Sequence, residues 1–491
     1  MSDQSLLEHP VIDGQRHTSR SVRSFEVINP ANEEVIGKVV DCDAQHVDDA
    51  VSAASEAQAK WMRTPPQQRG ERLWQFGQLI SEHGAELAKL DAICMGKPFR
   101  DGKGAVAEAT KHCRYWAGMA DKIWGDLIPV TPGYLSYTKR EPLGVSGIIL
   151  PWNGPVQSTV GRIAPALACG NSVVVKPSEF SPLSALRLAE LSVKAGMPAG
   201  LVNVVTGYGS VGQLLTEHPK VNGISFTGSL ETGRKVNQSA ARTFKKVVLE
   251  MGGKSPNIVF ADADLDEALR GTTWGVFYNT GQICCAGTRL LLERSIADEF
   301  LERLKLMATR IRIGDPMDES VHMGPLVCRK QFDRVQSYLD IGRSEATVFA
   351  GGGRPENVGD RGFFVAPTIF TDVSSQMRIA QEEIFGPVLT VMTFDNEDEA
   401  LRLANDVEYG LAANIWTSDV GKMLRIAEKV EAGTVWGNSM RLYDPALPYG
   451  GFKNSGLGNA SGEGAIEGNT RIKRISIRYE RDAKAPGWND L

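Results

Sequence analysis

Short apolar runs that end in glycine or proline recur from Val145 onward, with helical segments between them. Five such runs lie at 145–151, 172–177, 202–207, 224–228 and 246–253. This rhythm is typical of a parallel sheet that is buried on both faces. A second series of the same kind follows, at 255–260, 288–293, 388–394, 412–417 and 433–438. The sequence therefore predicts an α/β protein with two sheets, and its 491 residues fit two or three structural domains.

The segments outside these series carry other patterns. Residues 43–124 show a capping signal at Asp43 and a 3.6-residue period, which predict helices. Residues 134–144, YLSYTKREPLG, alternate between apolar and polar and predict an exposed pair of strands. Residues 471–480, RIKRISIRYE, alternate in the same way and predict one more strand.

Charge and composition argue against several classes of function. The net charge of −5, from 54 basic and 59 acidic residues, disfavours binding to nucleic acid or to an anionic membrane surface. The start MSDQSLLEHPVIDGQ lacks the features of a signal peptide, and no apolar run approaches the ~20 residues that span a bilayer. Seven unpatterned cysteines favour a reducing compartment, and the seven histidines show no metal-site spacing. We therefore expect a cytoplasmic protein with no metal ion in its chemistry.

An adjacent cysteine pair, Cys284 and Cys285, lies in NTGQICCAGTR (279–289), a stretch dense in Gly, Asn and Gln. A thiol in such a loop is not buried in apolar surroundings, so we expect its pKa not to be raised and its thiolate to stay accessible. A thiolate is a strong nucleophile toward a carbonyl carbon. We predict chemistry for this pair and simple core packing for the other cysteines, which are Cys42, Cys94, Cys113, Cys169 and Cys328.

A candidate base lies upstream of the cysteines, in VVLEMGGKSPNIVF (247–260). Glu250 stands where a β-branched run meets Gly252 and Gly253, and a side chain at such a junction can reach a cleft. A carboxylate beside an apolar strand can have its pKa raised toward neutrality, as a general base requires. Taken alone, Glu250 is more simply interpreted as a solvent-exposed residue at the end of a strand. Together with the cysteine pair it is favoured as a base.

These two motifs belong to a larger set. In order, the chain shows PWNGP (151–155), KPSE (176–179), FTGSLETG (226–233), LEMGGKSP (249–256), GQICCAG (281–287), EEIFGPV (382–388) and PYGGFKNSG (448–456). Their order and spacing resemble the aldehyde dehydrogenase superfamily, of the NAD(P)-dependent hydrolytic type, over nearly the whole chain. The resemblance implies a Rossmann-like cofactor domain, an α/β catalytic domain and a small β oligomerisation domain.

The resemblance also implies domain limits. Residues 1–122 and 142–253 would form the NAD-binding domain, and residues 254–468 the catalytic domain. Residues 123–141 and 469–491 would form bridging segments that mediate homodimers or homotetramers. A strand whose edge would otherwise be bare is consistent with subunit pairing.

By the same resemblance, Cys284 attacks the aldehyde carbon and Cys285 is a bystander. Asn153 and the backbone N–H of Cys284 would hold the oxyanion of the thiohemiacetal. Hydride transfer to the nicotinamide would leave a thioester, which water activated by Glu250 hydrolyses to the carboxylic acid. Lys176 is counted with this catalytic set.

The cofactor site is predicted from both sources. The GxGxxG at 207–212 follows a strand but lacks the expected acidic partner, so we interpret it as a turn near the adenosine. The resemblance puts the pyrophosphate at 228–233, where a strand leads into a helix N-terminus. A carboxylate at Glu179 would repel the 2′-phosphate of NADP, which favours NAD, with NADP the less favoured alternative. The predicted cofactor residues are Trp152, Lys176, Ser178, Glu179, Thr227, Gly228, Ser229, Gly233, Glu383 and Phe385.

The tunnel residues predict a substrate that is bulky or polar. Where the family commonly has bulky or apolar side chains, this chain has smaller or more polar ones, which imply a wide and wet tunnel. The positions are Gly154, Gln157, Gly161, Ile283, Arg441, Tyr443 and Tyr449. Arg441 either anchors a carboxylate of a semialdehyde acid, or pairs with Glu108 or Asp444, or faces solvent.

Three other functions stay open. CoA-acylating relatives transfer the acyl group to CoA and usually lack the base glutamate, so Glu250 argues against that activity. A non-catalytic protein that keeps only the fold would not need Cys284, Glu250 and Asn153. An unrelated cysteine hydrolase would need a histidine base near Cys284, and no histidine lies in a recognised motif.

Overall fold

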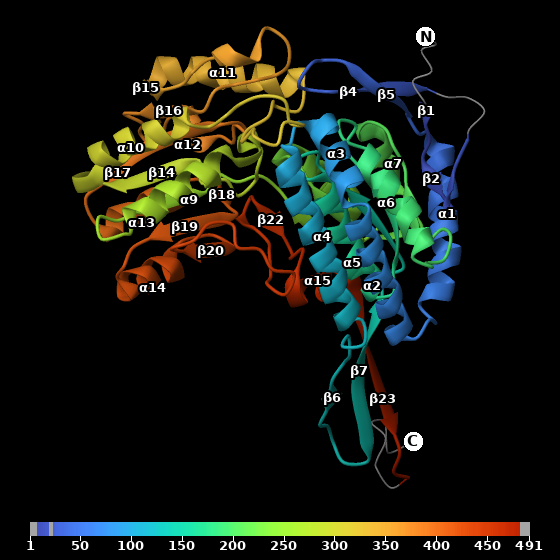
Figure 1. The fold of residues 1–491 in the computed structure, drawn as a ribbon. Coiled ribbons are helices and arrows are strands. Elements are labelled where there is room, and N and C mark those ends of the chain that lie inside the picture. Colours follow the sequence, from blue (N-terminus) through green and yellow to red (C-terminus); the bar gives the residue numbers. More distant parts are fainter. Residues whose placement is uncertain (1–6, 19–22, 482–491) are drawn as a thin grey trace, which may run out of the picture.

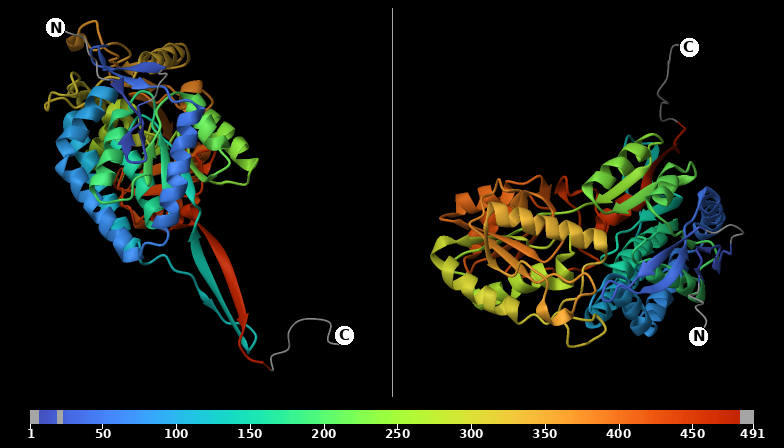
Figure 2. Two further views of the ribbon diagram at one scale, coloured as in Figure 1. Left: turned by 90° about the vertical axis from the view of Figure 1, so that its right-hand side faces the viewer. Right: turned by 90° about the horizontal axis from the view of Figure 1, so that it is seen from above.

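The structure, a computed structural model, describes residues 7–18 and 23–481. Two α/β bodies lie side by side, and a narrow β arm projects from the first of them (Figures 1 and 2). The predicted segments 1–122 and 469–491 extend beyond the described residues at 1–6, 19–22 and 482–491. Within the described ranges, none of the helices combines the length and apolarity needed to traverse a bilayer.

The first body is built on an eight-stranded sheet of order β22-β12-β11-β8-β9-β10-β2-β3. Its five central strands, β12 to β10, run parallel, as the first series of apolar runs predicts. The strands are β2 (Val11–Ile12), β3 (Gln15–Arg16), β8 (Val145–Ile149), β9 (Ser172–Lys176), β10 (Val202–Val204), β11 (Val221–Thr227), β12 (Lys246–Glu250) and β22 (Gly456–Leu457). The edge strands pair antiparallel.

Helices cover both faces of this sheet. Val173 and Val175 of β9 pack in one apolar cluster with α2–α6, while Val174 packs in another with α1, α7 and α8. The helices are α1 (Ala44–Trp61), α2 (Pro66–Glu82), α3 (Gly84–Met95), α4 (Phe99–Met119), α5 (Pro155–Ala168), α6 (Leu183–Lys194), α7 (Gly209–Glu217) and α8 (Leu230–Ala241). Asp43 caps α1 as predicted, because its side chain accepts the N–H of His46 at 3.1 Å. A small sheet of β1 (Leu7–Glu8), β4 (Ser24–Ile28) and β5 (Val35–Val40) precedes these helices.

The second body holds a seven-stranded sheet of order β15-β16-β17-β14-β13-β19-β20, parallel except at β15. The strands are β13 (Pro256–Val259), β14 (Arg289–Glu293), β15 (Thr347–Ala350), β16 (Thr368–Thr371), β17 (Val388–Phe394), β19 (Ala412–Trp416) and β20 (Thr434–Gly437). The helices are α9 (Leu265–Phe277), α10 (Ala297–Thr309), α11 (Arg329–Glu345), α12 (Arg378–Gln381), α13 (Glu397–Asn405) and α14 (Val420–Lys429). All five runs of the second predicted series are strands of this sheet.

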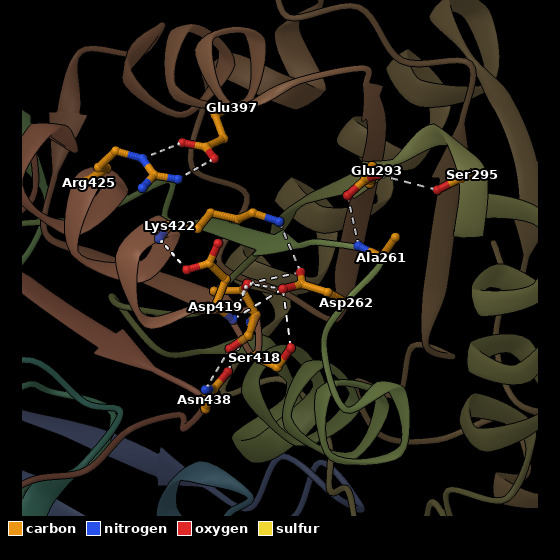
Figure 3. A network of polar contacts seen from close by, with 11 residues as sticks. Ala261, Asp262, Glu293, Ser295, Glu397, Ser418, Asp419, Lys422, Arg425 and Asn438 are labelled. Atoms are coloured by element: carbon orange, nitrogen blue, oxygen red, sulfur yellow. Dashed lines mark hydrogen bonds and ion pairs between the residues drawn. The ribbon is translucent and has the colours of Figure 1, made fainter.

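A polar network fixes the start of α14 to the ends of β13 and β19 (Figure 3). The Asp262 carboxylate accepts hydrogen bonds from the Thr417 hydroxyl at 2.7 Å and from Lys422 Nζ at 3.1 Å. Asp419 caps α14, and Arg425 pairs with Glu397 of α13 at 2.7 Å. These contacts link α13 and α14 to the sheet of the second body.

The last part of the chain returns to the first body. β18 (Tyr409–Gly410) pairs with β21 (Phe452–Lys453), β22 adds to β12, and α15 (Gly462–Asn469) contacts α5. The chain then forms β23 (Thr470–Arg478) in the arm.

The arm is a sheet of order β23-β7-β6 (Figure 2). β7 (Tyr134–Pro142) pairs antiparallel with β23 along its whole length, and β6 (Leu127–Ile128) lies on its other side. The expectation that residues 134–144 form a pair of strands is therefore wrong. They form one long strand, whose partners come from residues 127–128 and from the predicted strand at the end of the chain.

Candidate active site

A cleft opens at the carboxyl edge of the first sheet. β9 ends at Lys176, β11 at Thr227 and β12 at Glu250, and because these strands are parallel their ends meet at one edge. The cleft has a volume of about 740 Å³. Seven predicted cofactor residues line it: Trp152, Lys176, Ser178, Glu179, Thr227, Gly228 and Ser229.

Two helix starts face this cleft. Ser229 caps α8 by accepting the N–H of Thr232 at 3.4 Å, so the N-terminus predicted to hold the pyrophosphate borders the cleft. Gly209 and Gly212 of the GxGxxG line the same cleft, consistent with a turn close to a bound nucleotide. Gly207 has φ +139°, and a Cβ there would lie 2.5 Å from Val211. This turn therefore requires glycine.

Lys176 and Glu179 lie together on the cleft wall. Lys176 is buried, its Nζ lies 3.5 Å from Glu179 Oε2, and burial lowers the pKa of Lys176. Glu179 stays partly exposed and is also 3.4 Å from the Ser178 hydroxyl. The cleft further contains cations that sequence reasoning missed, Lys235, Arg242 and Lys330. They lie on exposed segments, so no apolar pattern marked them.

The remaining predicted cofactor residues, Gly233, Glu383 and Phe385, are not among the residues that line the cleft. Glu383 accepts the Gly253 N–H at 3.1 Å, and burial raises the pKa of Glu383 to about 7. The ring of Phe385 meets that of Trp152 edge-on, with centroids 5.3 Å apart. Gly233 packs in α8 against Met251, 3.0 Å from a Cβ placed there. Glu383 and Phe385 thus bring the second body to the cleft of the first.

Gly252 and Gly253, which follow Glu250, have no room for a side chain because other motifs pack directly against their backbone. A Cβ on Gly252 would lie 2.1 Å from Glu383 Oε2, and one on Gly253 would lie 2.6 Å from the Cys284 carbonyl oxygen. The turn therefore brings three motifs into contact: LEMGGKSP, EEIFGPV and GQICCAG.

The cysteine loop is held by amide side chains. It follows α9 through a short 3-10 turn, Tyr278–Gly281, in which Asn279 and Thr280 have φ of 52° and 59°. Asn279 Nδ2 donates to the Asn153 carbonyl at 3.0 Å, and Asn153 Nδ2 donates to the Gln282 carbonyl at 2.8 Å. Asn153, the predicted oxyanion donor, therefore lies against the cysteine loop, two residues before Cys284.

The two thiols differ in exposure. Cys284 is partly exposed, with its Sγ 3.7 Å from Tyr449 Oη, while Cys285 is fully buried with its Sγ 2.7 Å from Tyr443 Oη. Their surroundings are apolar: Ile283, Leu411, Ala412, Trp436, Tyr443 and Tyr449. A hydrogen bond with Cys285, together with burial, raises the pKa of the Cys284 thiol. The expectation of a thiol without a raised pKa is wrong, because residues distant in sequence cover the polar loop.

Glu250 is buried, with 3% of its surface exposed. Within the described residues, neither of its carboxylate oxygens has a hydrogen-bond partner. Burial raises the pKa of Glu250 to about 8, and the charge of Arg162 opposes that shift. The solvated-strand-end interpretation is therefore wrong.

Arg162 is a residue that sequence reasoning missed. It comes from α5, donates to the Thr227 hydroxyl at 3.1 Å, and interacts electrostatically with Glu250, Tyr449 and Cys284. These three side chains therefore surround a common point. The signal in the sequence was an arginine between the buried apolar residues Val160 and Ile163.

The tunnel positions on α5 leave open space. A Cβ on Gly154 would meet only Ser158 Oγ at 3.4 Å, and one on Gly161 only His112 Cε1 at 3.9 Å. Gln157 is half-buried on the same helix. Across from them, Ile283, Tyr443 and Tyr449 pack around the cysteines. Burial lowers the pKa of His112 to about 4, so this imidazole is neutral at physiological pH.

Four of the five remaining cysteines, Cys42, Cys94, Cys113 and Cys169, are buried in the core as predicted, whereas Cys328 is partly exposed beside α11.

Comparisons with known proteins agree on one family. The sequence model described as "Aldehyde dehydrogenase family" matches residues 17–475. An aldehyde dehydrogenase of Aspergillus niger is 43% identical over 470 residues, which cover 95% of this chain and 94% of that protein. A putative aldehyde dehydrogenase from Burkholderia cenocepacia has a crystal structure with TM-score 0.96 and 42% identity, covering 98% and 99% of the two chains. The NAD+ complex of an aldehyde dehydrogenase from Bacillus cereus has TM-score 0.95 and 39% identity, covering 97% of each chain.

Proposed function

The chain belongs to the aldehyde dehydrogenase family, and on that premise we propose that it oxidises an aldehyde to the carboxylic acid with NAD as hydride acceptor. The observation that carries this proposal is that Arg162 interacts with both a partly exposed Cys284 and a buried Glu250 whose carboxylate has no hydrogen-bond partner among the described residues. A nucleophile and a carboxylate that can accept a proton are the two groups that acyl transfer to water requires.

The cleft supports the choice of a dinucleotide. It combines a helix N-terminus at Ser229, the buried ammonium of Lys176 and the ring of Trp152. The first favours a phosphate and the second can donate to ribose hydroxyls. When bound there, NAD supplies the hydride acceptor. The relative from Bacillus cereus is described as an NAD+ complex.

In the proposed mechanism, Cys284 Sγ bonds to the aldehyde carbon. Because its pKa is raised, the partly exposed thiol loses its proton to solvent as it attacks, which leaves Glu250 free for the later step. The Cys284 backbone N–H and Asn153 Nδ2 hold the oxyanion of the thiohemiacetal. After oxidation to the thioester, Glu250 takes a proton from water, which attacks the acyl carbon and releases the acid. The charge of Arg162 favours the deprotonated form of Glu250.

The presence of Glu250 disfavours transfer of the acyl group to CoA. A carboxylate held without a partner in the site can activate water, whereas a CoA-acylating site has no use for it. Intact Cys284 and Glu250 likewise disfavour a purely structural role.

A broad aldehyde screen with NAD and NADP side by side tests the proposal. We expect NADH formation, higher kcat/KM for bulky or polar aldehydes than for acetaldehyde or propanal, and a preference for NAD of about tenfold or more, since Glu179 repels the 2′-phosphate. In Glu179→Gln the ratio of kcat/KM with NAD to kcat/KM with NADP should fall. Propanal as the best substrate would contradict the preference for bulky or polar aldehydes. Equal use of NADP by the unaltered enzyme would contradict the preference for NAD.

The arm supports a homo-oligomer of two or four chains. Its edge strand β23 carries Ile472 and Ile477 with 64% and 47% of their surfaces exposed, and Leu127 of β6 is 73% exposed. A long edge with apolar side chains is normally covered by another chain. Light scattering of the purified protein should give two or four times 53.3 kDa, and Ile472→Lys should shift the mass downward. A single-chain mass for the unaltered protein would exclude this assembly.

A further inference from the structure

Arg441 occupies an aromatic cradle near the cysteine loop. Its guanidinium carbon lies 4.5 Å from the ring centre of Trp274 and 4.0 Å from that of Tyr278. Within the described residues, its Nε and Nη1 are buried and have no hydrogen-bond acceptor. From this arrangement we infer that Arg441 binds a carboxylate at the far end of the aldehyde, so that the preferred substrates are semialdehyde acids. The inference rests on the proposed function and names its substrate class.

None of the local acids among the described residues forms an ion pair with Arg441, although the charge of Arg441 acts on Asp101. Asp444 pairs with Lys111 at 2.9 Å and accepts the Ala446 N–H at 2.9 Å, and Asp101 pairs with Arg100 at 3.5 Å. No ion pair joins Arg441 to Glu108 or to any other acid in the part of the chain that the structure describes. The expectation that Arg441 pairs with Glu108 or Asp444 is therefore wrong. Buried N–H groups nearly always have an acceptor, and here a ligand can supply it.

The cradle is connected to the nucleophile by short pieces of chain. Trp274 and Tyr278 lie one helical turn apart at the end of α9, and Tyr278 begins the turn that leads into Cys284. On the other side, Arg441 interacts electrostatically with Tyr443 and Cys285, and Tyr443 Oη lies 2.7 Å from Cys285 Sγ. The guanidinium therefore lies near the thiol pair without contacting Cys284, and the inferred site for the far end of the substrate is at this position.

The backbone of Arg441 is also unusual. Its φ of 57° lies in the left-handed region, which costs energy for a residue with a branched or long side chain. Such conformations persist where the surroundings fix them, and they concentrate at ligand sites. Trp274 keeps 45% of its surface exposed, so the cradle is reachable from solvent.

The chemistry of the cradle selects a carboxylate. Arginine is always charged, and its planar N–H donors form short charge-assisted bonds with carboxylates. The two rings lie 5.4 Å apart and pack against the guanidinium, which shields it from water on the side that they cover. A neutral aldehyde tail leaves the donors without an acceptor, so a site of this kind should reject it.

The test compares ω-carboxy aldehydes of increasing chain length with their methyl esters, in the presence of saturating NAD. In the unaltered enzyme, the ratio of kcat/KM for acid over ester should exceed one and should peak at one chain length. In Arg441→Gln this ratio should fall by about 10- to 100-fold, mostly through KM, and Arg441→Lys should retain part of it. Arg294→Gln is the matched control, since Arg294 is an exposed arginine of the second body that pairs with Asp395 and does not line the cavity beside Trp274, and it should leave the ratio unchanged.

The outcomes separate this inference from the proposed function. A ratio at or below one in the unaltered enzyme overturns the carboxylate site, even if Arg441→Gln fails to fold. A ratio that Arg441→Gln leaves unchanged overturns it as well. Absence of NADH with every aldehyde in the unaltered enzyme would instead overturn the proposed function. Melting temperatures of all variants identify any that are misfolded.

Discussion

Cys284→Ser should lower aldehyde-dependent NADH formation by on the order of 10³-fold or more. The side chain that replaces the thiol is nearly the same size, but its hydroxyl is much harder to ionise and a far weaker nucleophile. Binding of NAD should be largely intact, because Cys284 is not among the residues that line the cleft. Steady-state absorbance of NADH and a direct NAD-binding titration measure the two quantities.

Cys285→Ser is the matched control for that experiment. Cys285 is fully buried and lies against Tyr443, so it cannot reach a substrate without rearrangement of the loop. We expect this variant to keep most of its activity. An active Cys284→Ser together with an inactive Cys285→Ser would show that Cys285, and not Cys284, is the nucleophile.

Glu250→Gln should stop turnover after about one NADH per active site. The amide has the shape of the carboxylate but cannot accept a proton, so oxidation to the thioester can occur once while its hydrolysis is blocked. Stopped-flow absorbance should show a burst followed by a steady rate reduced about 10²- to 10⁴-fold. Unimpaired steady turnover in Glu250→Gln would exclude the role given to this residue.

The pH dependence of the unaltered enzyme should reflect the same group. Burial raises the pKa of Glu250 to about 8, and only the deprotonated carboxylate acts as a base. The rate of thioester hydrolysis should therefore rise with pH up to and through about 8. In Glu250→Gln that rise should be absent from the residual rate.

Much of the fold could be predicted from local patterns. The runs in β8 to β12 are continuously apolar because both faces of that sheet are covered, and this made them recognisable without a structure. Asp43 was recognisable as a cap because capping depends on residues three positions apart. The arm was less predictable, since residues 134–144 take their partner from the other end of the chain and local alternation cannot reveal that pairing.

The candidate site also contains residues that local motifs predict and residues that only the packing reveals. Cys284, Glu250 and Asn153 were predicted from motifs. In the structure, Arg162 interacts with both Cys284 and Glu250, and Asn153 bonds to the loop that carries Cys284. The raised pKa of Cys284 was missed because it depends on a hydrogen bond with Cys285 and on burial by Leu411 and Trp436, which lie more than 100 residues later in the chain. Arg162, and the contact that requires glycine at position 252, depend on packing between elements that no local pattern describes. The domain limits stay a prediction.

The most direct measurement of the central chemistry is mass spectrometry of Glu250→Gln after mixing with NAD and an aldehyde that the unaltered enzyme oxidises. Peptide mapping should find the acyl group on Cys284 at near one per chain, in proportion to the NADH formed in the burst. An acyl group on Cys285, or NADH formed with no acylated cysteine, would contradict the mechanism.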